Sequence, residues 1–270
     1  MIIIQHMDNS LPRALAPQLR AHLDVMPVVV VTGARQTGKT TLAQRLAPGP
    51  RRFTTLDDLD ALDAAQHDPD RLLGGRDAIT LDEIQRAPSL LAAIKRHVDS
   101  RRTSGRFLLT GSANLALMAS VSESLAGRAS YLTLWPMARQ EQRGLGRTGC
   151  WDDLLSAPDS DWQDILIAQP QHAEDWRVVA RRGGFPDPSV HLANDGERAI
   201  WFDGYIQTYL ERDLADLSSV ASLVDFRRLV RTACLRVGQV VNQTEMGRDA
   251  AVPQPTVHRY LNLLEASYLL

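Results

Sequence analysis

Five short apolar runs rich in β-forming residues divide the first half of the chain, and each is followed by turn residues or by helical spacing. The first, Val28 to Thr32, is a continuous valine segment of the kind that is buried on both faces of a parallel sheet. The others are Phe53 to Leu56, Ala78 to Leu81, Phe107 to Thr110 and Tyr131 to Leu134. Helical stretches such as Ser89 to Val98 separate them. The alternation predicts an α/β fold, with a parallel sheet and flanking crossover helices.

After Pro136 the pattern changes to helical periodicity broken by loops, including a GGFPDP turn at Gly183 to Pro188. The clearest helix in this part is Ala199 to Leu214. Ile200, Trp201, Tyr205, Tyr209 and Leu210 fall near one another there at helical spacing, and the aromatic residues among them are expected to pack in a core instead of forming a ligand cage. We therefore predict an α/β domain over residues 1–136, a mainly helical region over 137–220 and a last segment over 221–270.

The last segment has a helix-turn-helix rhythm: an apolar helix, a turn near Gly238, a polar helix around Thr244 to Ala250, and a final helix from Gln254. The final helix is expected to bury Val257, Leu261 and Leu264, and to present Thr256, His258, Arg259 and Asn262. Nearby positive charge comes from Arg227, Arg228, Arg231, Arg236 and Arg248. The pattern predicts a partial winged helix, for which DNA contact and protein docking both stay open.

The composition is that of an ordinary globular protein, with 270 residues, 44% hydrophobic content and a formal net charge of -2. This balance indicates no general affinity for nucleic acid or membranes. The two cysteines, Cys150 and Cys234, lie far apart and near no metal-binding cluster. The amino terminus lacks the basic region and long apolar core of a signal peptide, and no run reaches membrane-spanning length. We expect a cytoplasmic protein.

A phosphate-binding loop follows the first predicted strand. Its residues are Gly33, Ala34, Arg35, Gln36, Thr37, Gly38, Lys39 and Thr40, which fit G-x-x-x-x-G-K-[ST], with Thr41 beginning the helix that follows. The glycines let backbone N–H groups turn toward a bound phosphate. Lys39, one of only two lysines in the chain, is expected to pair with the β- and γ-phosphates of ATP. The Thr40 hydroxyl is expected to bind Mg²⁺.

Two adjacent carboxylates end the third predicted strand, in the pattern known as Walker B. Asp82 is suited to the Mg²⁺ shell, and Glu83 is placed to orient or deprotonate the attacking water. Adjacent acids favour a hydrolase over a kinase. A GTPase is disfavoured because the sequence has no N-K-x-D motif.

Polar residues also end the fourth strand, in Thr110 to Asn114, at the edge where open α/β sheets bind ligands. Thr110 is the favoured sensor of the γ-phosphate or water, with Asn114 and Ser112 as alternatives; a plain turn and helix cap is the competing interpretation.

Arg128 precedes the fifth strand and is a candidate arginine finger that reaches a neighbouring subunit's nucleotide, which implies a homo-oligomer. The competing interpretation is a surface salt-bridge arginine in an arginine-rich chain.

The motifs together resemble the prokaryotic two-module ATPases in which an AAA-type domain precedes a recurring domain of unknown function. The resemblance rests on TGARQTGKTTL (32–42), LDEIQRAP (81–88), LLTGSAN (108–114), SLAGR (124–128), GGFP (183–186) and YIQTYLERDL (205–214). It implies an AAA-type sheet, a helical region, a winged-helix-like segment and, in full-length relatives, a nuclease-like part. The chain ends in the apolar run Ser267 to Leu270, so we expect that it is truncated before that part.

Two functions follow as hypotheses. The first is Mg²⁺-dependent ATP binding and hydrolysis that drives a conformational change, on DNA or on a protein partner. The second is a regulatory switch or a DNA- or protein-binding module that holds ATP with little hydrolysis. A small-molecule kinase would need an acceptor pocket, for which the sequence shows no motif.

Overall fold

The computed structural model describes residues 11–47, 49–111, 124–147, 149–169, 174–208 and 222–269. The chain divides into two compact units, residues 1–191 and residues 192–270, and each is described by itself. The domain boundaries expected at residues 136 and 220 stay predictions. Among the described residues, no helix combines the length and apolar character needed to cross a membrane.

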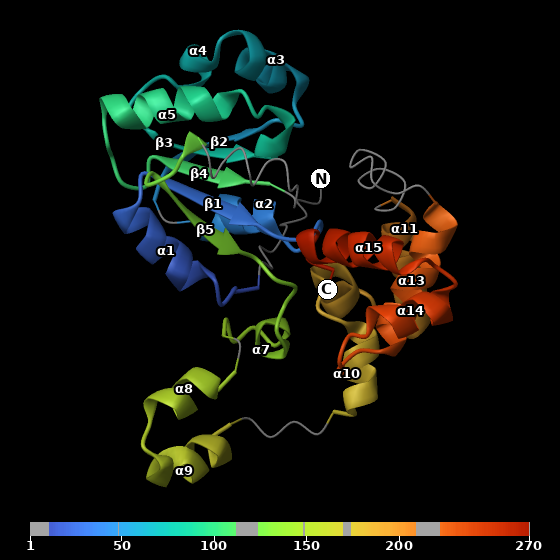
Figure 1. The fold of residues 1–270 in the computed structure, drawn as a ribbon. Coiled ribbons are helices and arrows are strands. Elements are labelled where there is room, and N and C mark those ends of the chain that lie inside the picture. Colours follow the sequence, from blue (N-terminus) through green and yellow to red (C-terminus); the bar gives the residue numbers. More distant parts are fainter. Residues whose placement is uncertain are drawn as a thin grey trace, which may run out of the picture. The chain divides into compact units, whose positions relative to one another are not determined.

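A five-stranded parallel sheet forms the centre of the first unit (Figure 1). Its strands are β1 (Val28–Thr32), β2 (Arg51–Thr55), β3 (Ala78–Asp82), β4 (Phe107–Thr110) and β5 (Ala129–Thr133). They lie in the order β2-β3-β4-β1-β5, and every neighbouring pair is parallel. The predicted fold class and all five predicted strands are confirmed.

The valine run of β1 is buried on both faces, as its composition predicts. Val28 and Val30 belong to the core on one face, which is covered by α3 (Leu59–His67), α4 (Pro69–Leu73) and α5 (Leu90–Ser100). Val29 and Val31 belong to the core on the other face, which is covered by α1 (Ala16–Val25) (Figure 1). The alternation follows from the two-residue period of a strand.

The helices of the first unit fall into two groups. Around the sheet they are α1 (Ala16–Val25), α2 (Lys39–Thr41) continued by a π-helical turn (Leu42–Leu46), α3 (Leu59–His67), α4 (Pro69–Leu73), a 3-10 turn (Ile84–Arg86) and α5 (Leu90–Ser100). After the sheet they are α7 (Arg139–Gln142), α8 (Trp151–Ser156), a 3-10 turn (Asp159–Asp161), α9 (Trp162–Ile167), α10 (Trp176–Arg182) and a π-helical turn (Asp187–His191).

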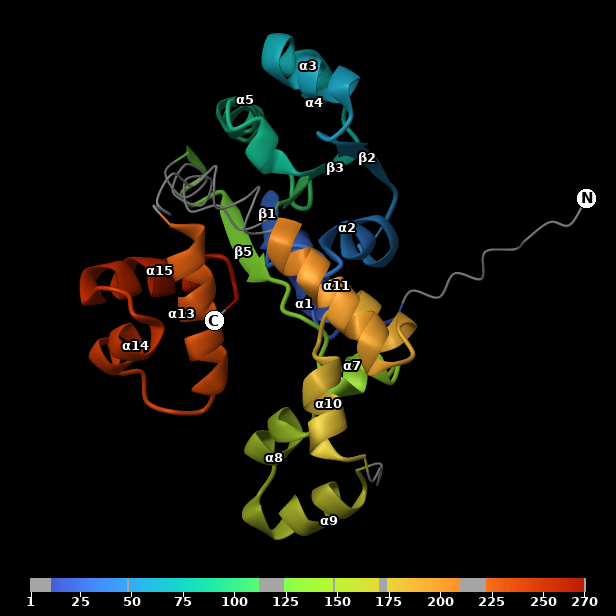
Figure 2. The same ribbon diagram turned by 90° about the vertical axis from the view of Figure 1, so that its right-hand side faces the viewer.

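The second unit is helical in its described part, with α11 (Asp195–Thr208), α13 (Leu223–Leu235), α14 (Gln243–Ala250) and α15 (Gln254–Ala266). Figure 2 shows α13, α14 and α15 packed as a three-helix bundle. Its core includes Phe226 of α13 and Tyr260 of α15, whose rings meet edge to face at 5.2 Å. The predicted helix-turn-helix rhythm is present; a winged helix stays a prediction.

The two predicted faces of α15 are largely as expected. Val257, Leu261 and Leu264 are buried, whereas His258, Arg259 and Asn262 are exposed and Thr256 is half-buried. Two of the arginines predicted to add positive charge are paired with acids. Arg236 bonds Glu245 and Asp249, and Arg228 bonds Asp225. These pairs leave the bundle less basic than the sequence suggests.

The aromatic helix begins earlier than predicted. Asn194 caps the backbone N–H of Glu197, so α11 starts at Asp195 instead of Ala199. Tyr205 is buried and stacks on Trp201 with centroids 5.2 Å apart, as a core role requires. Ile200, which shares the helical spacing, is 76% exposed. Tyr209 and Leu210 lie outside the described residues.

Candidate functional site

The predicted phosphate loop follows β1 at the carboxyl edge of the sheet, and it turns through three left-handed backbone positions. These are Gly33 (φ +143°), Gln36 (φ +60°) and Gly38 (φ +92°). A Cβ added at Gly33 would lie 2.3 Å from the carbonyl oxygen of Leu134, in the chain that follows β5. The first glycine of the motif is therefore required for two reasons: its φ is positive, and the backbone after β5 comes too close to leave room for a side chain.

Lys39 lies inside this loop, with only 6% of its surface exposed. Its Nζ donates hydrogen bonds to the carbonyl oxygens of Gly33 at 3.1 Å and Ala34 at 2.7 Å. Burial lowers the pKa of Lys39 to about 8, while the nearby carboxylates of Glu83 and Asp82 act in the opposite direction. The loop thus holds the partly desolvated Lys39 ammonium at the position where the motif requires a cation.

The remaining residues of the loop divide between its inside and its surface. Ala34 and Thr37 are buried, and the Thr37 hydroxyl donates to the Ala34 carbonyl at 2.9 Å. Arg35, Gln36 and Thr41 are exposed. The buried pair keeps the loop's shape, and the exposed residues face solvent.

Asp82 joins two threonines from other elements at the carboxyl edge. Its carboxylate is 4% exposed and accepts from the Thr40 hydroxyl at 2.9 Å through Oδ2 and from the Thr110 hydroxyl through Oδ1. The structure thereby brings together the two predicted metal ligands, Thr40 and Asp82. One carboxylate and one hydroxyl suit Mg²⁺, which keeps several waters and uses few protein ligands. Thr110 contacts Asp82 directly, and its role as a sensor of the γ-phosphate or water stays a prediction.

Glu83 follows directly in a left-handed conformation, with φ +58°. A residue with a Cβ in this region carries strain of about 1–3 kcal/mol, and such strain clusters at functional sites. The Gln85 side chain donates a hydrogen bond to the Glu83 carboxylate. Glu83 is half-buried, and its charge raises the pKa of Lys39, so the two groups share one electrostatic environment.

Arg128 lies at the other end of the sheet. Its carbonyl accepts from the backbone N–H of Val28 where β1 begins, whereas the phosphate loop follows the end of β1. Its guanidinium makes a two-pronged ion pair with Asp99, at 2.5 and 3.0 Å. Arg128 is therefore not brought together with Lys39 and Asp82 within one chain. Ser112 and Asn114 lie outside the described residues.

A buried ion pair beside the phosphate loop escaped the sequence reasoning. Arg13 and Glu141 are 7% and 4% exposed, and Arg13 Nε lies 3.0 Å from Glu141 Oε1. The other guanidinium nitrogens donate to the carbonyls of Thr37 and Trp135, both at 2.7 Å. Glu141 also accepts from the backbone N–H groups of Ala14 and Ala138, both at 2.7 Å. The pair ties the loop to two distant segments, and no local motif marks either residue.

The GGFP turn lies at the same place. Gly184 accepts from the Met137 N–H at 2.6 Å, and Gln142 Nε2 donates to the Gly183 carbonyl at 3.0 Å. A Cβ at Gly184 would lie 2.9 Å from the Met137 carbonyl oxygen. A Cβ at Gly38 of the loop would come within 3.9 Å of Pro186. The turn singled out in the sequence therefore rests beside the phosphate loop.

Comparison with known proteins divides the chain into two family matches. A family described as "AAA domain" matches residues 26–142, and a "Domain of unknown function" matches residues 173–270. Two uncharacterised proteins, Mb2031c of Mycobacterium bovis and Rv2008c of Mycobacterium tuberculosis, are each 36% identical over 93% of this chain. The chain spans about half the length of these relatives, 51% of each. A solved RuvB variant of Thermotoga maritima aligns over 94% of this chain and 84% of its own, with 16% identity and a TM-score of 0.38.

Proposed function

Because the chain carries an AAA domain followed by a recurring domain of unknown function, we propose that it binds ATP with Mg²⁺ and hydrolyses it to drive a conformational change. The observation that carries the proposal is the convergence of Lys39 and Thr40, at the start of α2, with Asp82, at the end of β3. Such convergence is what phosphate and metal binding require.

Nucleotide binding rests on the loop. Its backbone N–H groups and the Lys39 ammonium would hold the β- and γ-phosphates, the ammonium exchanging the carbonyls of Gly33 and Ala34 for phosphate oxygens. Thr40 and Asp82 would hold Mg²⁺, which when bound neutralises negative charge that develops on the phosphates. Thr110 keeps the Asp82 carboxylate in place.

Hydrolysis rests on Glu83. Its carboxylate follows Asp82 directly and would orient the attacking water or accept its proton. Since the Gln85 side-chain amide donates a hydrogen bond to that carboxylate, the water must displace this hydrogen bond or bind beside it. We therefore expect turnover to require a local rearrangement of the Glu83 and Gln85 side chains.

Coupling to the second unit rests on chain continuity. The GGFP turn lies beside the phosphate loop, where a Cβ added at Gly38 would come within 3.9 Å of Pro186. The chain passes from this turn through residues 187–191 into the second unit. A change in the loop on loss of the γ-phosphate would therefore reach the turn first. The output would be a contact of the second unit with DNA or with a protein partner.

A regulatory switch is the second candidate, and the Gln85 bond to Glu83 favours it, because it occupies the carboxylate that would act on water. Two measurements distinguish the ATPase from the switch: phosphate release by Glu83→Gln and nucleotide binding by Lys39→Ala. The ATPase proposal expects Glu83→Gln to bind ATP and to lose turnover, and Lys39→Ala to lose binding. Wild-type phosphate release by Glu83→Gln, with binding lost in Lys39→Ala, would establish the switch instead.

The partner is tested with the same preparation. ATP turnover is measured with and without duplex DNA over a range of salt concentrations. Stimulation that falls steeply with salt would support DNA contact through the exposed face of α15. Turnover unaffected by DNA would direct the search to protein partners.

The arginine-finger proposal requires assembly, because Arg128 lies at the amino edge of its own sheet. Turnover per subunit of Arg128→Ala is compared with that of wild type across protein concentrations. If turnover per subunit rises with protein concentration in wild type but not in Arg128→Ala, the result supports a finger that acts between subunits. Equal turnover at all concentrations leaves Arg128 as the partner of Asp99.

A further inference from the structure

A pocket of about 180 Å³ opens at the amino edge of the sheet, away from the phosphate loop. Gly75 and Arg76 precede β3 and Arg106 precedes β4, so these residues gather where the parallel strands begin. The end of α5 and the loop after it supply the rest of the lining: His97, Ser100, Arg101 and Thr103. The volume equals that of about six waters, enough for a phosphate group.

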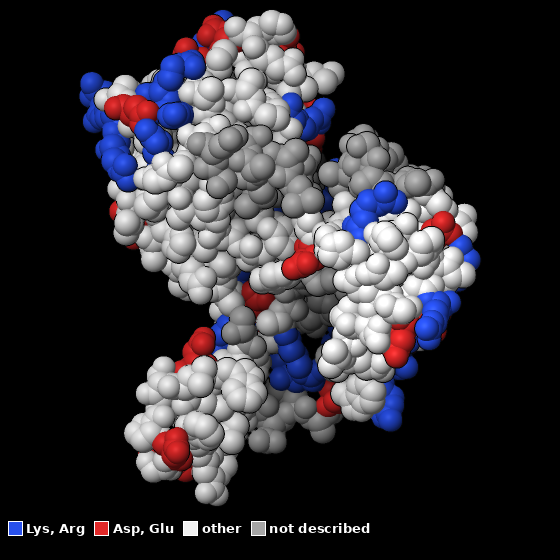
Figure 3. Space-filling view, viewed as in Figure 1, with Lys and Arg blue, Asp and Glu red and all other residues white. Residues whose placement is uncertain are grey.

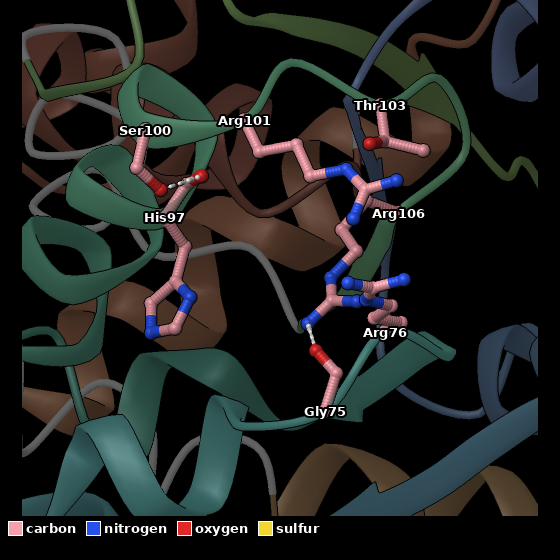
Figure 4. Close-up of a pocket in the computed structure, with 7 residues that line it drawn as sticks. All are labelled: Gly75, Arg76, His97, Ser100, Arg101, Thr103 and Arg106. Carbon is pink, nitrogen blue, oxygen red and sulfur yellow. Dashed lines mark hydrogen bonds between the residues drawn. The ribbon is translucent and has the colours of Figure 1, made fainter.

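Three guanidinium groups share this pocket. Figure 4 shows those of Arg76, Arg101 and Arg106 on one side, with His97 and Ser100 opposite. Arg106 Nη2 donates to the carbonyls of Leu73 and Gly75, which fixes one of the three. Blue side chains also gather on the surface over the end of α5 (Figure 3). The pocket is thus built around cations from two segments, the turn before β3 and the loop that joins α5 to β4.

The local negative charge does not balance these cations. Burial lowers the pKa of Arg106, Asp77 raises it, and the charges of Arg52 and Arg101 lower it further. The carboxyl end of α5 contributes about half a negative charge. Asp70 is bonded to Arg96 and His97. Asp77 and the helix end therefore leave the pocket with a net positive charge greater than one.

We propose that this amino-edge pocket is a second phosphate-binding site, separate from the phosphate loop, which takes a phosphomonoester or phosphodiester group. A guanidinium offers paired N–H donors that match two phosphate oxygens, and the Thr103 hydroxyl offers another donor. The three arginines come from two segments that meet at this edge of the sheet, so one oxyanion relieves their mutual repulsion. The inference does not depend on ATP hydrolysis.

The test removes cations from the pocket while the phosphate loop is silenced. Lys39→Ala is the background, so that added phosphate does not report on the loop. Binding of inorganic phosphate and of a short single-stranded oligodeoxynucleotide is measured by calorimetry, together with the His97 ring resonances. The double variant Arg76→Gln/Arg101→Gln is compared with Arg20→Gln, which removes one charge from an exposed arginine of α1 outside the pocket lining and serves as the control.

We expect the double variant to weaken binding at least about tenfold, since two charge-assisted contacts are lost, and Arg20→Gln to leave it unchanged. The His97 resonances should shift with the added phosphate. Binding of inorganic phosphate alone identifies a phosphomonoester source, and competition by the oligodeoxynucleotide identifies a phosphodiester source. The proposal would be overturned if neither probe binds, or if the double variant binds them as tightly as the background protein. The Lys39 and Glu83 variants test the ATPase proposal independently.

Discussion

Removal of the Glu141 carboxylate is expected to destabilise the first unit more than any exposed charge change. In Glu141→Ala, the Arg13 guanidinium stays buried at 7% exposure without its carboxylate, and the N–H groups of Ala14 and Ala138 lose their acceptor. Breaking a buried ion pair by deleting one partner costs about 3–5 kcal/mol. Glu141→Gln keeps the volume and one carbonyl oxygen, so we expect a smaller loss, of about 1–3 kcal/mol.

Urea unfolding followed by circular dichroism measures this loss in the first unit. The control is Glu174→Ala, which removes a carboxylate that also pairs with two arginines, Arg139 and Arg182, but at 29% exposure. Solvent replaces such a contact, so the control should unfold close to wild type. Equal unfolding midpoints in urea for Glu141→Ala and Glu174→Ala would show that the buried pair stabilises the unit no more than the more exposed one.

The same pair has a functional consequence through the Thr37 carbonyl. Arg13→Met removes the hydrogen bond that joins the segment before α1 to the phosphate loop. We expect weaker nucleotide affinity in addition to lower stability, because the loop must then be ordered by the ligand itself. Arg13→Met/Glu141→Met should recover part of the stability, since two apolar side chains leave no unpaired charge. It should not recover the affinity.

Three further predictions concern the phosphate loop and its neighbours. ATP affinity should fall as pH rises through about 8, because the free protein's Lys39 then loses the proton that phosphate binding requires; calorimetry in two buffers near pH 8.5 should detect proton uptake, and Lys39→Arg should remove it. Thr110→Val should lower kcat/KM about ten- to hundred-fold, the equivalent of about 1.5–3 kcal/mol for a lost bond to a buried carboxylate, and unchanged steady-state kinetics would exclude a positioning role. Gly33→Ala should lower stability and nucleotide binding more than Gly127→Ala, because both have positive φ but only Gly33 approaches another backbone; equal losses in thermal unfolding would refute the steric argument.

The sequence determined the parts of the site that depend on local pattern. The valine run of β1 leads into a glycine-rich loop, and the apolar run of β3 ends in Asp82 and Glu83. Strand formation and left-handed turns depend on residues close along the chain, so these elements could be predicted. The GGFP segment could also be predicted as a turn from its sequence, whereas its position beside the phosphate loop could not.

The tertiary structure decided which of these elements meet. Strand β4 lies between β1 and β3, which brings the Thr110 hydroxyl into hydrogen-bond contact with Asp82. Arg13 and Glu141 are 128 positions apart and form one buried pair, and acids neutralise Arg236 on the second unit. The pocket of arginines likewise forms only because parallel strands begin at one edge. Sheet order and long-range pairing depend on the packing of the whole chain, which the local alternation of apolar and polar residues does not encode.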